Sequence, residues 1–214
     1  MDILIIAAHP DDEVIGMGGT IKKLSDKKNT IHLCVVTEGA SAQYKDKKMI
    51  RVRKEACKRA GKILGISTYD FLNFSDMKLD SIPQVEINKK IEKIIQKYNP
   101  KVVYTTPKSD FNNDHKIVNE SSIIATRTTN SNTKKIFSYE LPGPEKTFFQ
   151  PNYFENISVQ FPIKIKAFNE YKSEIEKFPH PRSIESLENL AIQRGIDSGL
   201  MKAEAFNVVR IISE

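Results

Sequence analysis

A histidine and two aspartates stand together near the start of the chain, in the segment Ala8-His9-Pro10-Asp11-Asp12-Glu13. His9 and Asp12 are three residues apart across a tight turn and can point at one spot, and Asp11 must project toward whatever occupies it. The acidic pair alone could simply cap a helix, since carboxylates favour its positive N-terminal end. An imidazole beside them has little structural purpose there. The segment therefore predicts a metal site with His9 and Asp12 as ligands and Asp11 as the group that activates water.

A second segment of the same type, Ser109-Asp110-Phe111-Asn112-Asn113-Asp114-His115, follows an expected strand and opens another helix. In an open parallel sheet the loops after the strands converge at one end and bind ligands there. We therefore expect His115 to meet His9 and Asp12. Two histidines and one aspartate leave a fourth position for water or substrate, which distinguishes a catalytic zinc site from a closed structural one. We expect Asp114 to accept a hydrogen bond from an imidazole or to cap its helix.

The other two histidines are weaker candidates. His32 alternates with apolar residues in an expected strand and is interpreted as structural. His180 lies in the segment Phe178-Pro179-His180-Pro181-Arg182-Ser183, just before an expected helix. It could reach the site to contact substrate or to transfer a proton, because the ordinary pKa of an imidazole is close to neutral.

Alternating strands and helices must position these residues. Continuous apolar runs predict strands buried on both faces, and apolar residues at helical spacing predict the helices between them. This order is typical of right-handed βαβ units. The predicted fold class is α/β, a three-layer Rossmann-like fold with a mostly parallel central sheet and helices on both faces. The expected strands are 2–8, 30–37, 68–74, 101–105 and 135–140, and the expected helices are 11–27, 47–64, 85–98 and 115–126.

The last third of the chain is less regular. Residues 141–161 contain prolines and are expected to form loops and short strands. Residues 162–178 and 183–198 have helical patterns, and 206–212 could form a final strand. Because no clear linker or repeat interrupts the chain, we expect one domain over residues 1–214, with a core in 1–140 and irregular loops and C-terminal helices in 141–214.

The composition suits an ordinary globular protein, with 39% hydrophobic and 28% charged residues. The net charge of +6 would permit nucleic-acid binding. The lysines are spread along expected helix faces, however, so we expect a solvated surface and no nucleic-acid partner. Cys34 and Cys57 lie far apart in the pattern, and two free thiols suit a reducing compartment. With no apolar run long enough for a membrane span, a cytoplasmic location is expected. A homo-oligomer is left open.

The opening motif closely resembles that of a known enzyme family, the PIG-L/LmbE-like zinc-dependent de-N-acetylases. The likeness covers nearly the whole chain. Its segments are His9-Pro10-Asp11-Asp12-Glu13, Gly16-Met17-Gly18-Gly19-Thr20, Arg53-Lys54-Glu55-Ala56, Ile63-Leu64-Gly65-Ile66, Phe71-Leu72-Asn73-Phe74-Ser75-Asp76, Phe111-Asn112-Asn113-Asp114-His115, Arg194-Gly195 and Ala203-Glu204-Ala205-Phe206.

The resemblance implies roles for individual residues. His9, Asp12 and His115 would hold one zinc ion per chain, and Asp11 would be the general base. Arg53 matches an arginine near the substrate, although Arg51 is close enough to leave the choice open.

One position departs from the family pattern. Many members carry a histidine three residues before the last ligand, thought to stabilise the oxyanion, and this chain has Asn112 there. The amide of Asn112 can donate a hydrogen bond to an oxyanion but cannot pass a proton. His180 or Asp11 would then have to protonate the leaving amine.

The implied activity is that of a zinc-dependent N-deacetylase acting on an N-acetylated sugar, often N-acetylglucosamine linked to another group. Two other enzyme classes stay open. A metal-dependent phosphoesterase suits His and Asp ligands on a basic chain, although such sites often hold two metals. A nucleotide-binding oxidoreductase suits the alternation of strands and helices. Its fingerprint, however, needs glycines in the turn directly after the first strand, and Gly16 to Gly19 come later.

Overall fold

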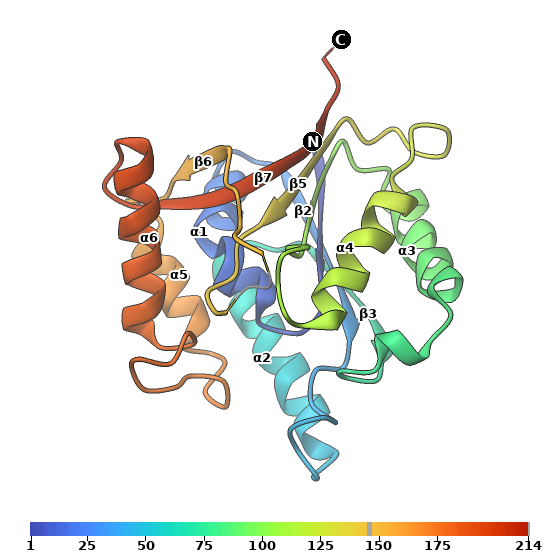
Figure 1. Cartoon of the computed structure of the whole chain (residues 1–214), viewed down its shortest axis with the longest axis horizontal. Helices are drawn as coiled ribbons and strands as arrows, with labels where there is room; N and C mark the ends of the chain where they lie inside the picture. The colour runs from blue at the N-terminus through green and yellow to red at the C-terminus, as the bar shows by residue number, and fades with distance from the viewer. Residues whose placement is uncertain (145–146, 214) are drawn as a thin grey trace.

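A seven-stranded sheet forms the centre of the computed structural model, which describes residues 1–144 and 147–213 (Figure 1). The strands are β1 (Asp2–Ala7), β2 (Thr30–Thr37), β3 (Thr68–Phe74), β4 (Val102–Thr105), β5 (Lys135–Tyr139), β6 (Tyr153–Asn156) and β7 (Ala203–Ile211). The helices are α1 (Asp12–Asp26), α2 (Lys48–Leu64), α3 (Gln84–Tyr98), α4 (Asn113–Ala125), α5 (Phe161–Phe168) and α6 (Ile184–Ser198), with a short 3-10 helix η1 (Leu79–Ser81).

The strand order is β3-β2-β1-β4-β5-β7-β6. The first five of these are parallel to their neighbours, whereas β7 pairs antiparallel with both β5 and β6. The chain runs outward from β1 to β3, then returns to place β4 on the other side of β1. This reversal places the topological switch point of the sheet between β1 and β4. In such sheets ligands bind at the switch point, outside the carboxyl ends of the strands.

The alternation of side chains along β1 divides the interior into two cores. Ile3, Ile5 and Ala7 face one core with apolar residues of α1, α2, α5 and α6. Leu4 and Ile6 face the other with residues of α3 and α4. Helices therefore cover both faces of the sheet (Figure 1), and the predicted three-layer, mostly parallel α/β fold is confirmed.

The largest departure from the expected elements follows α5. A helix was expected over 162–178, but α5 ends at Phe168 and the next residues form turns. Tyr171 and Glu174 in those turns are buried. The Tyr171 hydroxyl donates to Glu13 in the first turn of α1, and Glu174 pairs with Arg53 of α2. These long-range contacts override the local helical pattern. Of the expected loop over 141–161, residues 145 and 146 lie outside the described part.

Helix α1 has a kink at Met17, where φ is −147° and ψ is 25°. The kink separates backbone N–H groups from helical acceptors, and the Glu204 carboxylate accepts from the N–H of Gly19 at 3.0 Å and of Thr20 at 2.7 Å. Lys164 from α5 completes this buried group, with Nζ 2.7 Å from Glu204 Oε1. The C-terminal strand and α5 thereby fix the helix that opens at the carboxyl end of β1.

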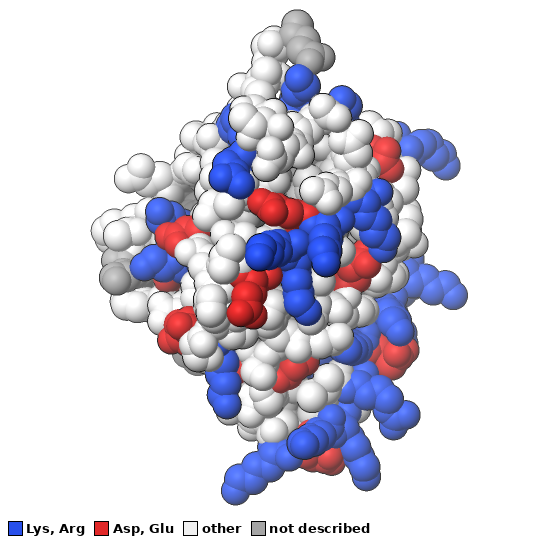
Figure 2. All heavy atoms as spheres, turned by 90° about the vertical axis from the view of Figure 1, so that its right-hand side faces the viewer, with Lys and Arg blue, Asp and Glu red and all other residues white. Residues whose placement is uncertain are grey.

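The surface on the α3 and α4 side carries both charge signs. Figure 2 shows Lys and Arg side chains spread over this face with Asp and Glu among them. On α3, the cation of Lys97 lies 2.8 Å from Asp70, and beside that helix Arg127 pairs with Glu92. Within the described residues, no helix is long and apolar enough to cross a membrane.

Removal of the Glu204 carboxylate should destabilise the fold strongly. Glu204→Ala leaves the buried ammonium of Lys164 without its partner, so we expect the free energy of unfolding to fall by about 3 kcal/mol. Urea denaturation followed by circular dichroism measures the change. Asp26→Ala is the control, because its pair with Lys22 is solvent-exposed and should contribute less than about 0.5 kcal/mol. Equal losses in the two variants would contradict this account of the buried pair.

Candidate metal centre

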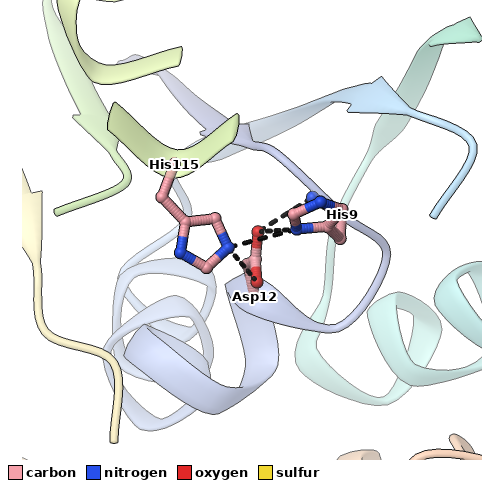
Figure 3. Close-up of side chains that lie close together, drawn as sticks. All are labelled: His9, Asp12 and His115. Atoms are coloured by element: carbon pink, nitrogen blue, oxygen red, sulfur yellow. Dashed lines mark hydrogen bonds and ion pairs between the residues drawn. The ribbon is translucent and has the colours of Figure 1, made fainter. Parts of the chain in front are cut away.

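Two neighbouring strands bring the predicted ligands together. His9 follows β1, Asp12 is the first residue of α1, and His115 lies in the first turn of α4, which follows β4. Since β1 and β4 pair directly, their carboxyl ends place all three side chains at the switch point of the sheet. Figure 3 shows the three side chains pointing toward one another.

The facing atoms of these residues form a compact triangle. His9 Nδ1 lies 3.1 Å from His115 Nε2 and 3.5 Å from an oxygen of Asp12, and His115 Nε2 lies 3.4 Å from the other oxygen of Asp12. Ligands about 2.0–2.1 Å from a tetrahedral zinc ion are separated by roughly 3.3 Å. The spacing of the three groups therefore suits a single small divalent cation.

The outer nitrogen of each imidazole is held by carboxylates. His115 Nδ1 lies 2.7 Å from Asp110, and His9 Nε2 lies 3.2 Å from both Asp76 and Asp114. A neutral imidazole has one N–H and one lone pair, so these carboxylates place the proton on the outer nitrogen. Two lone pairs then face each other beside the Asp12 carboxylate, an arrangement that requires a cation between them.

The pKa values of the buried groups show the same preference for positive charge. Burial lowers the pKa of His9, but hydrogen bonds to the surrounding carboxylates raise it well above its ordinary value. Burial also acts against the cation of His115, yet Asp12 and Asp110 raise the pKa of that imidazole to about 9. Burial acts to raise the pKa of Asp12, but the two histidines outweigh burial and hold that pKa well below its usual range. The site thus stabilises a cation, which can be a proton or a metal ion.

A second set of nearby ligand atoms consists of His9 Nε2 and the carboxylates of Asp76 and Asp114. It shares His9 with the first set. Because a neutral imidazole offers only one lone pair, His9 cannot ligate two metals while keeping its N–H. The backbone N–H groups of Met77 and Leu79 also donate to Asp114. Asp76 and Asp114 are therefore better suited to orienting the His9 ring than to binding a second metal.

The carboxylate of Asp11 lies beside the metal set, fully buried. Its backbone has φ +133°, a conformation that costs a non-glycine residue of order 1–3 kcal/mol. Neither carboxylate oxygen accepts a hydrogen bond from the described residues. Burial raises the pKa of Asp11, and the guanidinium groups of Arg182 and Arg53 oppose that rise. A buried acceptor held in a strained conformation points to a ligand beyond the protein itself.

Two arginines and Glu174 surround Asp11. Arg53 Nη2 lies 3.1 Å from Asp11 Oδ2 and 3.3 Å from Glu174, and Arg182 Nη1 lies 2.9 Å from the same glutamate. Arg182 Nη2 is 3.6 Å from Asp11, beyond hydrogen-bond distance. Arg53 is thus buried beside Asp11, whereas Arg51 is exposed, and the substrate-binding role of Arg53 stays a prediction.

Backbone groups hold the guanidinium of Arg53 in place. It donates to the carbonyl of Pro10 at 2.8 Å and to the carbonyl of Gly39. Glu13, behind Asp11, accepts from the Asp11 N–H at 3.1 Å and from the Tyr171 hydroxyl. Burial raises the pKa of Glu13 to about 8. These contacts fix the turn that carries His9 to Asp12.

The remaining predicted residues have varied positions. Asn112 is the N-cap of α4 and accepts from the Asp114 N–H at 2.9 Å through its side-chain oxygen, not its amide nitrogen. His180 is exposed, and its Nδ1 accepts from the Arg182 N–H at 3.1 Å. The catalytic roles of both stay predictions. His32 contacts Thr68 and Asp2 through its ring nitrogens, in agreement with its structural interpretation.

Sequence reasoning missed four side chains of this site: Asp76, Asp110, Glu174 and Arg182. Asp76 had a usable signal, because it follows β3 at the same end of the sheet as His9. Asp110 stood within the recognised segment before His115. Turns after α5 bring Arg182 toward Asp11 and Glu174 to Arg53 and Arg182, and no local pattern indicates those contacts.

Comparison with known proteins identifies relatives of this chain. Residues 4–126 match the family described as PIG-L, GlcNAc-PI de-N-acetylase. The Escherichia coli K12 protein called uncharacterized deacetylase YaiS is 33% identical over 80% of this chain and 90% of its own. Diacetylchitobiose deacetylase from Thermococcus kodakarensis is 27% identical over 97% of this chain and 82% of its own.

A solved structure agrees over the whole fold. The N,N'-diacetylchitobiose deacetylase from Pyrococcus horikoshii superposes with a TM-score of 0.81 and 25% identity, covering 98% of this chain and 84% of that one. With a family match over more than half of its length, this chain belongs to the PIG-L family of de-N-acetylases.

Proposed function

We propose that this protein is a zinc-dependent hydrolase that removes the N-acetyl group from an N-acetylated sugar, held as a conjugate with a further group. The observation that carries the proposal is the close approach of His9 Nδ1 and His115 Nε2 beside Asp12, next to a buried Asp11 that accepts no hydrogen bond from the described residues. The named activities of the relatives supply the substrate class.

His9, Asp12 and His115 would hold the metal, and Asp76, Asp114 and Asp110 would keep both imidazoles in the ligating tautomer. A zinc ion there polarises an amide carbonyl and makes water acidic near neutral pH. The donor set of two nitrogens and one oxygen leaves room for water and substrate, as hydrolytic zinc sites do.

Asp11 would act as the general base. Its carboxylate oxygens accept no hydrogen bond from the described residues and can take the proton of a water molecule that attacks the acetamide carbonyl. Arg53, Arg182 and Glu174 would hold the carboxylate in position. Asp11, once protonated, can deliver that proton to the departing amine, while His180 is an alternative donor. The side-chain amide of Asn112 would support the oxyanion, because its capping bond uses only the oxygen.

The rival enzyme classes fit less well. A two-metal phosphoesterase would need His9 to serve two cations, against its single lone pair. A dinucleotide-binding site would need the glycines in the turn after β1, whereas Gly16 lies inside α1. A Cβ added at Gly16 would lie 2.5 Å from the Tyr139 ring. The glycine there allows close helix–sheet packing and not phosphate binding.

Loss of a ligand should abolish metal binding. We expect the wild-type protein, purified without chelator, to contain one zinc per chain and to release acetate from methyl N-acetylglucosaminide. His9→Ala should lose the metal and at least about a hundredfold in activity. His32→Gln is the matched control, because that histidine lies away from the site, and it should keep both. Full activity in metal-free His9→Ala, or two metals per wild-type chain, would reject this mechanism.

Loss of the base should leave the metal in place. In Asp11→Asn the amide can no longer accept a proton, so kcat should fall by about 10²- to 10⁴-fold with unchanged zinc content. Stopped assays of acetate release with metal analysis measure both quantities. Asp26→Asn, on the exposed face of α1, controls for the substitution. An unchanged rate in Asp11→Asn would show that Asp11 is not the general base.

Arg182 should act on kcat through Asp11. Removing its guanidinium in Arg182→Met frees the Asp11 carboxylate to move, and a small displacement of a catalytic group can cost between about ten- and a hundredfold in rate. Arg182→Lys should restore part of that loss, since it keeps a cation. Arg127→Met, an exposed arginine on the other side of the sheet, is the control. Equal kcat in Arg182→Met and wild type would show that Arg182 does not position the base.

A further inference from the structure

An open groove lies beside α4, on the face of the sheet that α3 and α4 cover only in part. The apolar core on this face takes its members mainly from β1, β2, β4, α3 and α4. Past α4, residues of β5 and β7 line a cavity of about 1150 Å³, and residues 147–150 form its outer wall. This volume is slightly larger than the range of about 300–1,000 Å³ that is usual for ligand pockets.

The groove begins next to the metal centre. Lys116 directly follows the ligand His115, and Asn119 lies four residues beyond His115, about 6 Å along α4. Lys108 and Ser109, at the same end, precede the Asp110 that holds His115. A substrate whose acetamide reaches the metal set can therefore extend along α4.

Hydrogen bonds make the floor of the groove rigid. Asn119 Nδ2 donates to the carbonyl of Thr106 at 2.7 Å, and the Ser138 hydroxyl donates to the same carbonyl at 2.7 Å. The Thr106 hydroxyl in turn donates to the carbonyl of His115 at 2.7 Å. The floor and the metal ligand thus belong to one connected network.

The charge of the groove is opposite to that of the metal centre. None of the described residues that line it is acidic, whereas it contains the cations of Lys108 and Lys116. Lys108 lies 3.6 Å from Glu120 with most of its side chain in solvent. Lys116 forms no ion pair with any described residue. Two lysines with little compensation beside amide and hydroxyl groups attract an anion.

We propose that this groove binds the part of the substrate beyond the N-acetylated sugar, and that this part carries a carboxylate or a phosphate. The inference rests on the proposed deacetylase function and specifies the conjugate on which it acts. The groove is large enough for a group comparable to a second sugar or a nucleoside, with the anion near Lys108 and Lys116.

The test compares anionic and neutral conjugates in one pair of variants. The substrates are N-acetylglucosamine 1-phosphate, N-acetylglucosaminyl malate and the neutral methyl N-acetylglucosaminide. In Lys108→Gln/Lys116→Gln we expect kcat/KM to fall about tenfold or more on at least one anionic substrate and less than about twofold on the neutral one. The phosphate and carboxylate arms identify which anion the groove prefers. Lys89→Gln/Lys93→Gln removes the same charge from the exposed face of α3 and should change none of the three values.

Each failure has its own signature. Equal losses on all three substrates, or no loss on either anionic one, would overturn the groove as an anion site while leaving the deacetylase function in place. A wild-type protein that releases acetate from none of them would reject the proposed function. In that case, calorimetric binding of glucosamine 1-phosphate, weakened about tenfold in the double lysine variant, would still support the groove. Equal binding by both proteins would overturn it.

Discussion

Two imidazole nitrogens that face each other at 3.1 Å, His9 Nδ1 and His115 Nε2, are the constraint on which the rest of the site depends. They face inward because carboxylates occupy the outer nitrogen of both rings. Without a cation between them, this arrangement is repulsive, and the Asp12 carboxylate adds negative charge at the same point. The protein keeps these groups buried together, so the surrounding fold must supply the rigidity that holds them there.

The topology supplies that rigidity. The switch in strand order places β4 beside β1, so that the turn after one strand and the helix after the other meet. Contacts from distant parts of the chain hold α1 against the sheet. The Lys164–Glu204 pair binds its kinked middle, and the Tyr171 hydroxyl reaches Glu13 in its first turn. The turns after α5 therefore contribute to the site through residues that a longer helix, continuing past Phe168, would have carried away from it.

The ligand set could be predicted from sequence because its signals are local. His9 and Asp12 stand in one turn after an apolar strand, and His115 stands in a second segment of the same kind. The parallel part of the sheet could also be predicted, because the alternation of strands and helices is a local signal in the sequence. Arg182, which approaches Asp11, and Glu174, which pairs with Arg53 and Arg182, could not be predicted, because the turns after α5 bring them to the site. The early end of α5 has this cause too, since burial of Tyr171 and Glu174 outweighs helical propensity over those residues.

X-ray absorption at the zinc K-edge of the metal-loaded protein tests the central claim most directly. The account predicts a first shell of nitrogen and oxygen atoms at about 2.0–2.1 Å, with the outer scattering of two imidazole rings. Sulfur at about 2.3 Å would instead assign the metal to Cys34 or Cys57. A second metal at about 3.5–4 Å would likewise contradict the single site built on the opposed histidines.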